Sequence, residues 1–226
     1  MIPGARLVLL GRQGAGKGTQ CVRLARHYVV PHISTGDMLR MAVKEGTDFG
    51  GRAKEFMDAG ELLPDDVMCG IVQERLGRED TTNRGYILDG FPRTVVQAES
   101  LASITADAGQ PLDLVVDLEV PEEVVIERIS KRRVCIDCGT NYSVDSPPRY
   151  DWTCDNCGGE VEQRDDDTEE AIRHRLELYA QQTAPLIAWY DDQGLMVAVE
   201  GRGHPDEVTQ RLIRTVDART RGGIVG

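Results

Sequence analysis

The sequence predicts an α/β fold with a parallel sheet, and three observations support this fold class. A short apolar run at residues 5–10 ends in a glycine-rich segment, which is typical of a buried parallel strand. Further apolar runs occur at residues 86–89, 112–119 and 196–200. These runs alternate with segments of helical pattern, and such alternation favours a parallel sheet covered by helices.

The helices are expected in the segments between the strands. Residues 17–28 predict a helix directly after the glycine-rich segment. Pro121 is followed by two glutamates and predicts a helix start, because proline fits the first turn and carboxylates face its positive end. Residues 168–190 predict a long helix with a kink at Pro185, and residues 205–219 predict a last helix.

Two segments interrupt this alternation and are predicted to be lobes inserted into a core domain. Residues 34–63 are mostly helical in pattern and contain no good strand. Residues 132–164 are rich in Cys, Gly, Asp and Pro and poor in aliphatic side chains. The tail, residues 221–226, is expected to be disordered. The core domain then comprises residues 1–33, 64–131 and 165–220.

Composition restricts the classes of partner. The 226 residues include 26 Lys and Arg and 38 Asp and Glu, so the net charge is 26 − 38 = −12. This charge disfavours general nucleic-acid binding, whereas a small anionic substrate can still be bound by a few cations in a cleft. No apolar run approaches the ~20 residues that span a membrane, and no secretory signal pattern is evident. We therefore expect a soluble, cytoplasmic protein that does not bind membranes.

Residues 11–19 form the strongest short motif and read GRQGAGKGT. Glycines allow backbone N–H groups to turn around phosphate oxygens, and the helix that follows adds its positive end. Lys17 can reach the outer phosphates of a nucleotide. A glycine-rich turn without a ligand is the alternative, but the strand, lysine and helix together favour a phosphate-binding loop.

The residue after the lysine is Gly18, where most nucleoside triphosphatases have Ser or Thr as a magnesium ligand. The form GxxGxGKGT resembles the loop of nucleoside monophosphate kinases. Longer stretches that resemble adenylate kinases read ISTGDMLR at 33–40, MDAG at 57–60, LDGFPRT at 88–94 and TAPLI at 183–187.

Two further stretches resemble the ends of the adenylate kinase lid. Arg132 and Arg133 resemble the arginine pair that opens it, and residues 164–176 resemble the R-x-D-D…R-x-R-L segment that closes it. The similarity runs from about residue 5 to residue 216, with the motifs in family order. The chain therefore resembles the long-lid, zinc-containing bacterial adenylate kinases.

The resemblance implies a three-layer P-loop fold and a reaction. Residues 34–63 would form a helical lobe that binds the nucleoside monophosphate, and residues 132–164 would form a zinc-binding lid. The implied reaction is reversible, Mg-dependent transfer of a phosphoryl group from ATP to AMP, giving two ADP. ATP, AMP and ADP are the implied partners.

The resemblance also implies roles in binding ATP. Asn141 and Tyr142 would line its base, and the backbone of Gly203 would contact it where some relatives have a lysine. The residues implied to hold the phosphate groups are Gly14, Ala15, Gly16, Lys17, Gly18 and Thr19.

A second set of residues is implied for AMP. Gln97 is expected to read the adenine edge, because an amide can pair with adenine through two hydrogen bonds. The full implied set is Thr35, Arg40, Glu61, Leu62, Leu63, Gly90, Phe91, Pro92, Arg93 and Gln97.

Charged residues are implied at the point of transfer. Asp89 would position magnesium through water, and Lys17 and Arg93 would act on the phosphates beside it. The arginines implied to converge on the moving phosphoryl group are Arg132, Arg164 and Arg175. A single arginine near a helix end is usually a solvated surface charge, so this interpretation depends on all of them occurring together. No covalent intermediate and no histidine base are expected.

Four of the six cysteines form two pairs with the spacing Cys-x2-Cys-x15-Cys-x2-Cys: Cys135, Cys138, Cys154 and Cys157. This spacing predicts a tetrahedral zinc site. Four thiolates leave no open position, so we predict structural rather than catalytic zinc, which substitutes for a core in a lobe with few apolar residues. The other two cysteines, Cys21 and Cys69, are expected to be small buried apolar residues in helices.

Three functions are compatible with these patterns. ATP:AMP phosphotransfer is the first. The second is another monophosphate kinase, one that uses CMP, UMP or GMP, or GTP as donor. The third is a P-loop ATP-binding regulator with a zinc ribbon for nucleic acid, which the acidic composition around the cysteines disfavours. A monomer is expected, because no heptad or large apolar surface pattern is present.

Overall fold

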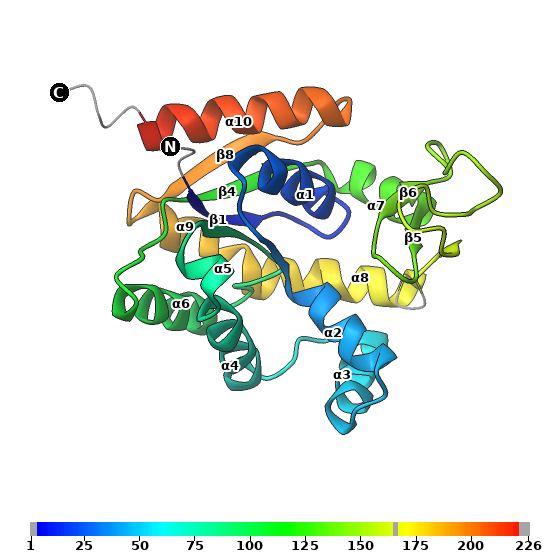
Figure 1. Ribbon diagram of the computed structural model, residues 1–226, viewed down its shortest axis with the longest axis horizontal. Coiled ribbons are helices and arrows are strands. Elements are labelled where there is room, and N and C mark those ends of the chain that lie inside the picture. The colour runs from blue at the N-terminus through cyan, green and yellow to red at the C-terminus, as the bar shows by residue number, and fades with distance from the viewer. Residues whose placement is uncertain (1–3, 165–166, 222–226) are drawn as a thin grey trace.

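The computed structural model describes residues 4–164 and 167–221 and has a parallel sheet at its centre (Figure 1). The strand order is β2-β3-β1-β4-β8, and every neighbouring pair is parallel. The predicted α/β fold is therefore confirmed. The strands are β1 (Ala5–Leu10), β2 (His32–Ser34), β3 (Gly85–Asp89), β4 (Leu114–Glu119) and β8 (Met196–Glu200).

Helices cover both faces of this sheet (Figure 1). The α-helices of the described residues are α1 (Lys17–Tyr28), α2 (Thr35–Lys44), α3 (Asp48–Ala59), α4 (Asp65–Leu76), α5 (Glu79–Thr82), α6 (Val95–Asp107), α7 (Glu122–Lys131), α8 (Glu169–Leu178), α9 (Pro185–Asp191) and α10 (Pro205–Arg221).

Strand β1 contributes to a separate core on each face. Leu7 and Leu9 pack in one cluster with residues of α1, α7 and α10. Val8 and Leu10 pack in the other cluster with residues of α4, α6 and α9. Successive side chains of a strand point to opposite faces, so a strand buried on both sides reads as a continuous apolar run. This burial explains the pattern at residues 5–10 and gives the fold three layers.

The predicted long helix at residues 168–190 is divided in the structure. Helix α8 ends at Leu178, a π-helical segment (Tyr179–Thr183) follows, and α9 begins at Pro185. Proline fits the first position of a helix, because the missing N–H has no intrahelical partner there. The break thus lies at the proline where a kink was predicted. At the C-terminal end of the chain, α10 includes Arg221, which was expected to belong to the disordered tail. The other residues of that expected tail, 222–226, lie outside the described residues.

The two inserted segments differ in structure. Residues 34–63 contain α2 and α3, which pack against each other. Residues 132–164 form an antiparallel sheet of order β6-β5-β7, with strands β5 (Arg132–Cys135), β6 (Asn141–Ser143) and β7 (Val161–Glu162). The two segments touch, because Lys44 Nζ lies 2.7 Å from Asp137 Oδ1.

Candidate active site

Three functional segments begin where neighbouring parallel strands end. The phosphate loop follows β1, the segment from Thr35 follows β2, and the segment from Gly90 follows β3. The carboxyl ends of parallel strands share one edge of the sheet, and ligands of open α/β sheets bind at that edge. The topology therefore brings together motifs that are up to about eighty residues apart in the sequence.

The loop between β1 and α1 has a backbone that requires glycine. Gly14 has φ 83°, and a Cβ atom there would lie 2.6 Å from Ile129 Cγ1 on α7. Gly16 caps the N-terminus of α1 with φ 100° and no side-chain cap. The first N–H groups of the helix therefore remain available to an anion, which the helix end also attracts.

Lys17, the first residue of α1, is directed back into the loop. Its Nζ donates hydrogen bonds to the carbonyl oxygens of Gly11 at 2.7 Å and Arg12 at 2.9 Å. Burial lowers the pKa of Lys17 below its ordinary value, and the carboxylate of Asp89 opposes this shift. The ammonium group is thus held where the phosphates of a bound nucleotide would lie.

Asp89 ends strand β3 beside Lys17. Burial alone would raise the pKa of its carboxyl group, but nearby His32, Lys17 and Arg93 lower it below the ordinary value. A Cβ atom on Gly18 would lie 3.4 Å from Asp89 Oδ2, so this carboxylate faces the first turn of α1. The Asp89 carboxyl group therefore stays ionised next to the phosphate loop.

Two predicted arginines lie close enough to Lys17 to act on it electrostatically. Arg93 and Arg132 both lower the pKa of Lys17, although less than burial does. Arg132 also forms a bidentate ion pair with Asp167, with Nε 2.8 Å from Oδ2. The structure thus gathers Lys17, Asp89, Arg93 and Arg132 from three separate segments into one charged cluster.

The predicted AMP segments after β2 and β3 are joined by hydrogen bonds. Thr35 Oγ1 donates to the carbonyl oxygen of Gly90 at 2.9 Å, and Arg93 Nε donates to the same oxygen at 2.8 Å. Gly90 has φ 82°, and a Cβ atom there would lie 2.8 Å from Thr35 Oγ1. Only glycine allows these two segments to approach so closely.

The side chain of Gln97, on α6, is engaged by protein groups at both ends. Its Oε1 accepts from the backbone N–H of Arg93 at 2.8 Å, and its Nε2 donates to Asp65 Oδ1 at 2.7 Å. The residue is only 2% exposed. The amide is therefore fixed in orientation beside Arg93, and its contact with a base remains a prediction.

The other predicted arginines lie around the inserted segments. Arg40 pairs with Asp37 one turn earlier on α2. Arg175, on α8, donates from Nη2 to the carbonyl oxygen of Met57 at 2.7 Å. Arg164 follows β7 and is partly buried. The next two residues of the R-x-D-D motif, 165 and 166, lie outside the described residues.

Other predicted AMP residues contribute differently. The side chains of Leu63 and Phe91 are buried in the core cluster on the α6 face, so a contact with AMP there would use backbone atoms. Pro92 is also buried, and Leu62 is partly buried. Glu61 Oε1 lies 2.8 Å from His174 Nε2, which links the first lobe to α8.

Arg128 was not identified from the sequence but lies at the phosphate loop. Its Nη1 donates to the carbonyl oxygen of Ala15 at 3.0 Å, and its Nη2 donates to that of Gly201 at 3.1 Å. It therefore bridges the loop to the segment of Gly203, a predicted contact of ATP. Arg128 lies in the last turn of α7 and Arg132 already begins β5, so no sequence motif or helix spacing marked Arg128.

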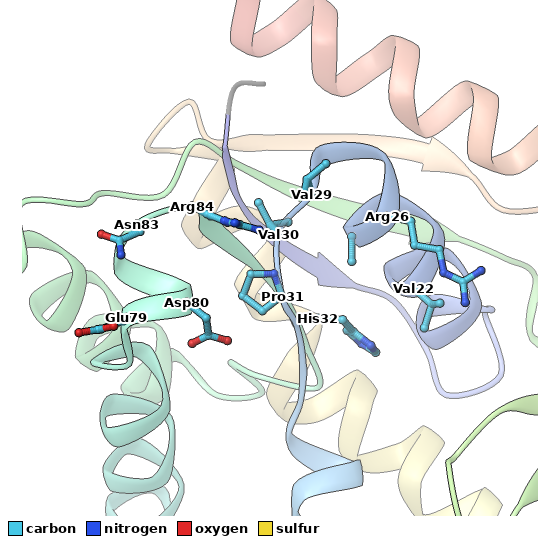
Figure 2. A pocket seen from close by; sticks show the side chains of 11 residues that line it. Val22, Arg26, Val29, Val30, Pro31, His32, Glu79, Asp80, Asn83 and Arg84 are labelled. Atoms are coloured by element: carbon cyan, nitrogen blue, oxygen red, sulfur yellow. The ribbon is translucent and has the colours of Figure 1, made fainter. Parts of the chain in front are cut away.

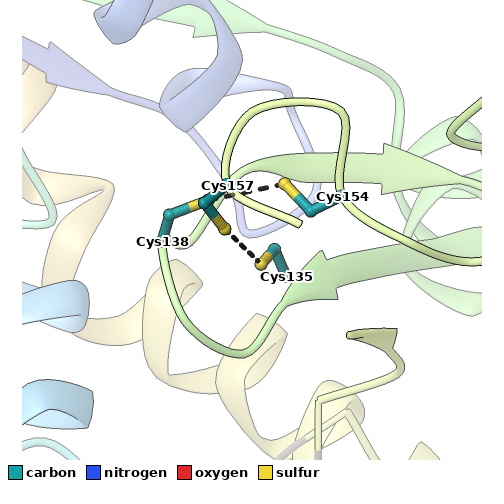
Figure 3. A group of neighbouring side chains, drawn as sticks. All are labelled: Cys135, Cys138, Cys154 and Cys157. Carbon is teal, nitrogen blue, oxygen red and sulfur yellow. Dashed lines mark hydrogen bonds between the residues drawn. The ribbon is translucent and has the colours of Figure 1, made fainter. Parts of the chain in front are cut away.

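The four paired cysteines come together in the second lobe (Figure 3). Their Sγ atoms lie within 4.8 Å of one another, with 3.5 Å between Cys135 and Cys157 and 3.6 Å between Cys138 and Cys154. A Zn–S bond of about 2.3 Å implies a sulfur separation of about 3.8 Å in a tetrahedral site. The cluster thus fits a zinc ion.

Tyr142 belongs to this cluster. Its ring packs against the apolar group that contains Cys135, Cys154 and Val161, and its hydroxyl donates to Cys154 Sγ at 3.4 Å. Burial alone would raise the pKa of Cys154, but hydrogen bonds from Tyr142 and the backbone N–H of Asn156 lower it to about 6. The neighbouring Asn141 faces the phosphate loop instead, with Nδ2 3.6 Å from a Cβ atom built on Gly18.

Comparison with known proteins gives one consistent family. The adenylate kinase family model matches residues 9–195. The chain is 50% identical to an adenylate kinase of Geotalea daltonii over 208 residues, covering 92% of this chain and 97% of the relative. It is 52% identical to an adenylate kinase of Thermodesulfovibrio yellowstonii, covering 95% of this chain and 100% of the relative.

A third relative has a similar degree of identity. The chain is 51% identical to an adenylate kinase of Methanosarcina mazei over 196 residues, covering 86% of this chain and 90% of the relative. Within residues 4–164 and 167–221, no helix is long and apolar enough to cross a membrane. From the matches over nearly its whole length, this chain belongs to the adenylate kinase family.

Proposed function

We propose that this enzyme transfers the terminal phosphoryl group of ATP directly to AMP, with Lys17 and a set of arginines holding the charge. An oxygen of the AMP phosphate attacks the terminal phosphorus of ATP. The bond from that phosphorus to the bridging oxygen breaks, and two ADP molecules result. Phosphoryl transfer needs alignment and positive charge rather than covalent help from the protein. The charged cluster of Lys17, Asp89, Arg93 and Arg132 is the observation that carries this proposal.

The donor site is proposed at the loop after β1. The backbone N–H groups between Gly14 and Thr19 would hold the phosphates, and Lys17 would exchange its bonds to loop carbonyls for bonds to phosphate oxygens. Asn141, Tyr142 and Gly203 would lie along the base. Arg128 is partly buried and joins the phosphate loop to the segment of Gly203. It would be a further contact of ATP.

The acceptor site is proposed between α2 and the segment after β3. The guanidinium groups of Arg40 and Arg93 would bind the AMP phosphate, because they match phosphate oxygens in a fixed fork and stay charged. Thr35 and Gly90 keep this segment close to α2. The base would then lie toward Gln97, with backbone contacts from Glu61, Leu62, Leu63, Phe91 and Pro92.

Arg132, Arg164 and Arg175 are proposed to meet on the moving phosphoryl group when the lobes close. When the lobes close, Arg132 would give up its ion pair with Asp167 and bind phosphate oxygens instead. Asp89 would hold water around the magnesium that adenylate kinases use with ATP. That ion, when bound, supplies positive charge to the phosphate oxygens. Closure also excludes water, which would otherwise hydrolyse ATP.

The lid metal is proposed to be structural zinc. The four sulfur atoms fill a tetrahedral shell and leave no position for substrate. The lid packs few apolar residues around Cys135, Cys154 and Val161, so metal bonds would replace a larger core. We further propose residues 34–63 and 132–164 as the two mobile lobes on a core of residues 1–33, 64–131 and 165–220.

The state and location of the enzyme are also proposals. Its net charge of −12 disfavours nucleic-acid partners, which supports a role confined to small nucleotides. A monomer in the cytoplasm, free of membranes, is proposed from the family and from the absence of a repeated apolar surface pattern in the sequence. Sedimentation analysis of the purified chain would test the monomer.

Steady-state phosphotransfer with each substrate pair tests the proposed reaction. The rate should be highest with ATP and AMP, and far lower with CMP, UMP, GMP or with GTP as donor. Lys17→Met should lower turnover on the order of a hundred- to thousandfold, because it removes charge at the transferred group. Its melting temperature should stay close to that of the wild type. Preference for another monophosphate, or ATP binding without transfer, would contradict the proposal.

A further inference from the structure

A second group of metal-ligating side chains lies beneath the phosphate loop. It consists of Cys21 on α1, His32 on β2 and Asp89 at the end of β3, and one ligand atom of each lies within 4.8 Å of the others. His32 Nε2 is buried and has no hydrogen-bond partner among the described residues. It lies 3.6 Å from Asp89 Oδ2, which is too far for a hydrogen bond.

The unpartnered nitrogen is the feature that points to a ligand. A buried polar atom without a partner is costly, so native structures rarely keep one without a reason. We propose that Cys21 Sγ, His32 Nε2 and the Asp89 carboxylate form a second metal site for a divalent cation of the zinc class. Sulfur, imidazole nitrogen and carboxylate oxygen are all zinc ligands, and three of them leave a fourth position for water.

The geometry requires only small movements. Zinc bonds of about 2.0–2.3 Å bring tetrahedral ligand atoms to within roughly 3.3–3.8 Å of one another. All three separations here are within 4.8 Å, so side-chain rotations that move atoms by about an ångström suffice. The strands and helix that carry the three residues need not move.

Charge balance favours this site although it is buried. Metal binding displaces the thiol proton of Cys21 into solvent, and neutral His32 gives up no proton. The thiolate and the Asp89 carboxylate then match the two positive charges of the ion. The ion and its three ligands are then neutral together, which lowers the cost of burying the ion beside Lys17. Lys17 is a competing cation beside Asp89, and its Nζ is held by the carbonyl oxygens of Gly11 and Arg12.

A cavity gives the ion a route to His32. The cavity has a volume of about 870 Å³ and lies between α1 and α5. Figure 2 shows His32 at one end of it, with Val22 and Arg26 of α1 beside it and Asp80 and Arg84 across the space. The ring can therefore be reached without passing through the nucleotide sites.

Occupation of this site would inhibit the enzyme. Asp89 cannot both ligate this ion and hold the water shell of magnesium at ATP, so free zinc should act against Mg-ATP. This consequence, unlike the site itself, rests on the role proposed above for Asp89. The site differs from the lid cluster in ligand set, in position and in its open fourth coordination position.

Equilibrium dialysis against free Zn²⁺ without nucleotide, followed by metal analysis, tests the site on the complete chain. The wild type should hold about two ions per chain, one in the lid and one at Cys21. Cys21→Ala and His32→Gln should each hold about one. Cys69→Ala is the matched control, since it removes a thiol on α4 outside both clusters, and it should keep about two.

Inhibition of the enzyme by Zn²⁺ is the second measurement. The Zn²⁺ concentration that halves the rate should rise at least about tenfold in Cys21→Ala, which loses a ligand, and should not change in Cys69→Ala. One ion in the wild type, or two ions in both Cys21→Ala and His32→Gln, would overturn the site. Loss of the second ion in Cys21→Ala but not in His32→Gln would also overturn the site, because the histidine would not be a ligand. Two ions without inhibition would support the site and contradict the role of Asp89.

Discussion

The amide of Gln97 is held by the protein and still keeps hydrogen-bonding groups for the base that we propose it recognises. An amide has two N–H donors and a carbonyl oxygen with two lone pairs. Asp65 uses one donor and the backbone N–H of Arg93 uses one lone pair. One donor and one lone pair remain, which is the combination that pairs with the edge of adenine. The two protein contacts therefore orient the amide for a base without consuming it.

Gln97→Leu should weaken the binding of AMP and reduce the preference of the enzyme for AMP over other monophosphates. The substitution removes hydrogen bonds worth on the order of 1–3 kcal/mol, so KM for AMP should rise roughly five- to 150-fold. Stability should also fall, because the N–H of Arg93 and the carboxylate of Asp65 lose their partner. Steady-state kinetics with AMP, GMP and CMP and a melting curve would measure both effects.

Gln110→Leu is a matched control for this variant. Gln110 follows α6 and donates to the carbonyl oxygen of Thr82 at 2.8 Å, away from the proposed AMP segments. It should cost some stability but leave KM for AMP unchanged. If Gln97→Leu likewise left KM for AMP unchanged, Gln97 would not be the reader of the base.

The buried ammonium of Lys17 predicts a pH dependence of ATP capture. Burial lowers its pKa below the ordinary 10.5 in the free enzyme. The group is charged below that folded pKa and loses its charge as pH rises through it. Because kcat/KM reports the free enzyme, kcat/KM for ATP should fall with a midpoint below 10.5. Bound phosphates favour the ammonium form, so kcat should fall at a higher pH.

Lys17→Arg distinguishes this titration from alkaline unfolding. A guanidinium group stays charged above pH ~12, so any remaining activity should lose the alkaline fall in kcat/KM. Circular dichroism at each pH would show that both proteins stay folded over the range compared. A wild-type kcat/KM that stayed constant up to unfolding would contradict a lowered pKa for Lys17.

Among the elements, long buried strands were predictable and short edge strands were not. Strands β1, β3, β4 and β8 are at least five residues long and mostly apolar, so each produced a clear run. Strand β2 has three residues, His32, Ile33 and Ser34, of which only Ile33 is buried. A strand with one buried side chain has no periodicity, so no strand was predicted there and the helical segment was predicted to begin at residue 34.

Residues 132–164, the proposed lid, were also only partly predictable from the sequence. Its metal cluster followed from cysteine spacing alone, because four ligands at that spacing have few other uses. Its strands did not, because β7 has two residues and β6 has none that is fully buried. Tyr142 was assigned to ATP by resemblance, whereas its hydrogen bond to Cys154 could be found only from the fold.

Cys135→Ser should separate stability from chemistry. It replaces one of four sulfur ligands, so zinc should bind more weakly and the lid should lose what substitutes for its core. Loss of a few kcal/mol in a chain of this size would lower the melting temperature on the order of 10 °C. Turnover at low temperature should survive in part, because ATP binding to Arg132, Arg164 and Arg175 can still close the lobe.

Cys69→Ser and metal analysis complete this test. Cys69 is a partly buried thiol on α4, so its loss should not change the zinc content of the lid. Wild-type protein that contains no zinc and takes up none would remove the structural-metal proposal. Loss of turnover in Cys135→Ser with an unchanged melting curve would instead indicate catalytic zinc.

At the scale of the whole molecule, the active site exists only where distant segments meet. Motif resemblance identified Lys17, Asp89, Arg93 and Arg132 one by one, and the fold brings them together. Arg128 belongs to no quoted motif, and its contacts with Ala15 and Gly201 depend on how α7 packs beside the loop. Residues of this kind are identified by packing and not by sequence pattern.

The two inserted segments, residues 34–63 and 132–164, touch each other. Lys44 of the first segment pairs with Asp137 of the second, and the hydrogen bond that Lys44 donates to Asp137 raises the pKa of Lys44. Both side chains are exposed, so salt should weaken the pair, and removing it should change ligand affinity by at most about fivefold. We therefore expect the proposed closure to depend mainly on nucleotides that both segments would contact.

A ligand that joins two adenosines through a polyphosphate chain should consequently bind once per molecule and far more tightly than ATP. Its second half binds at an effective concentration set by the linker, which can increase affinity on the order of 10²–10⁴-fold. Arg40→Ala should remove most of this gain while leaving ATP affinity nearly unchanged, because Arg40 belongs to the proposed acceptor lobe. Calorimetry measures both affinities and the stoichiometry. Affinity no better than that of ATP, or two molecules bound per chain, would contradict two adjacent sites facing one charged cluster.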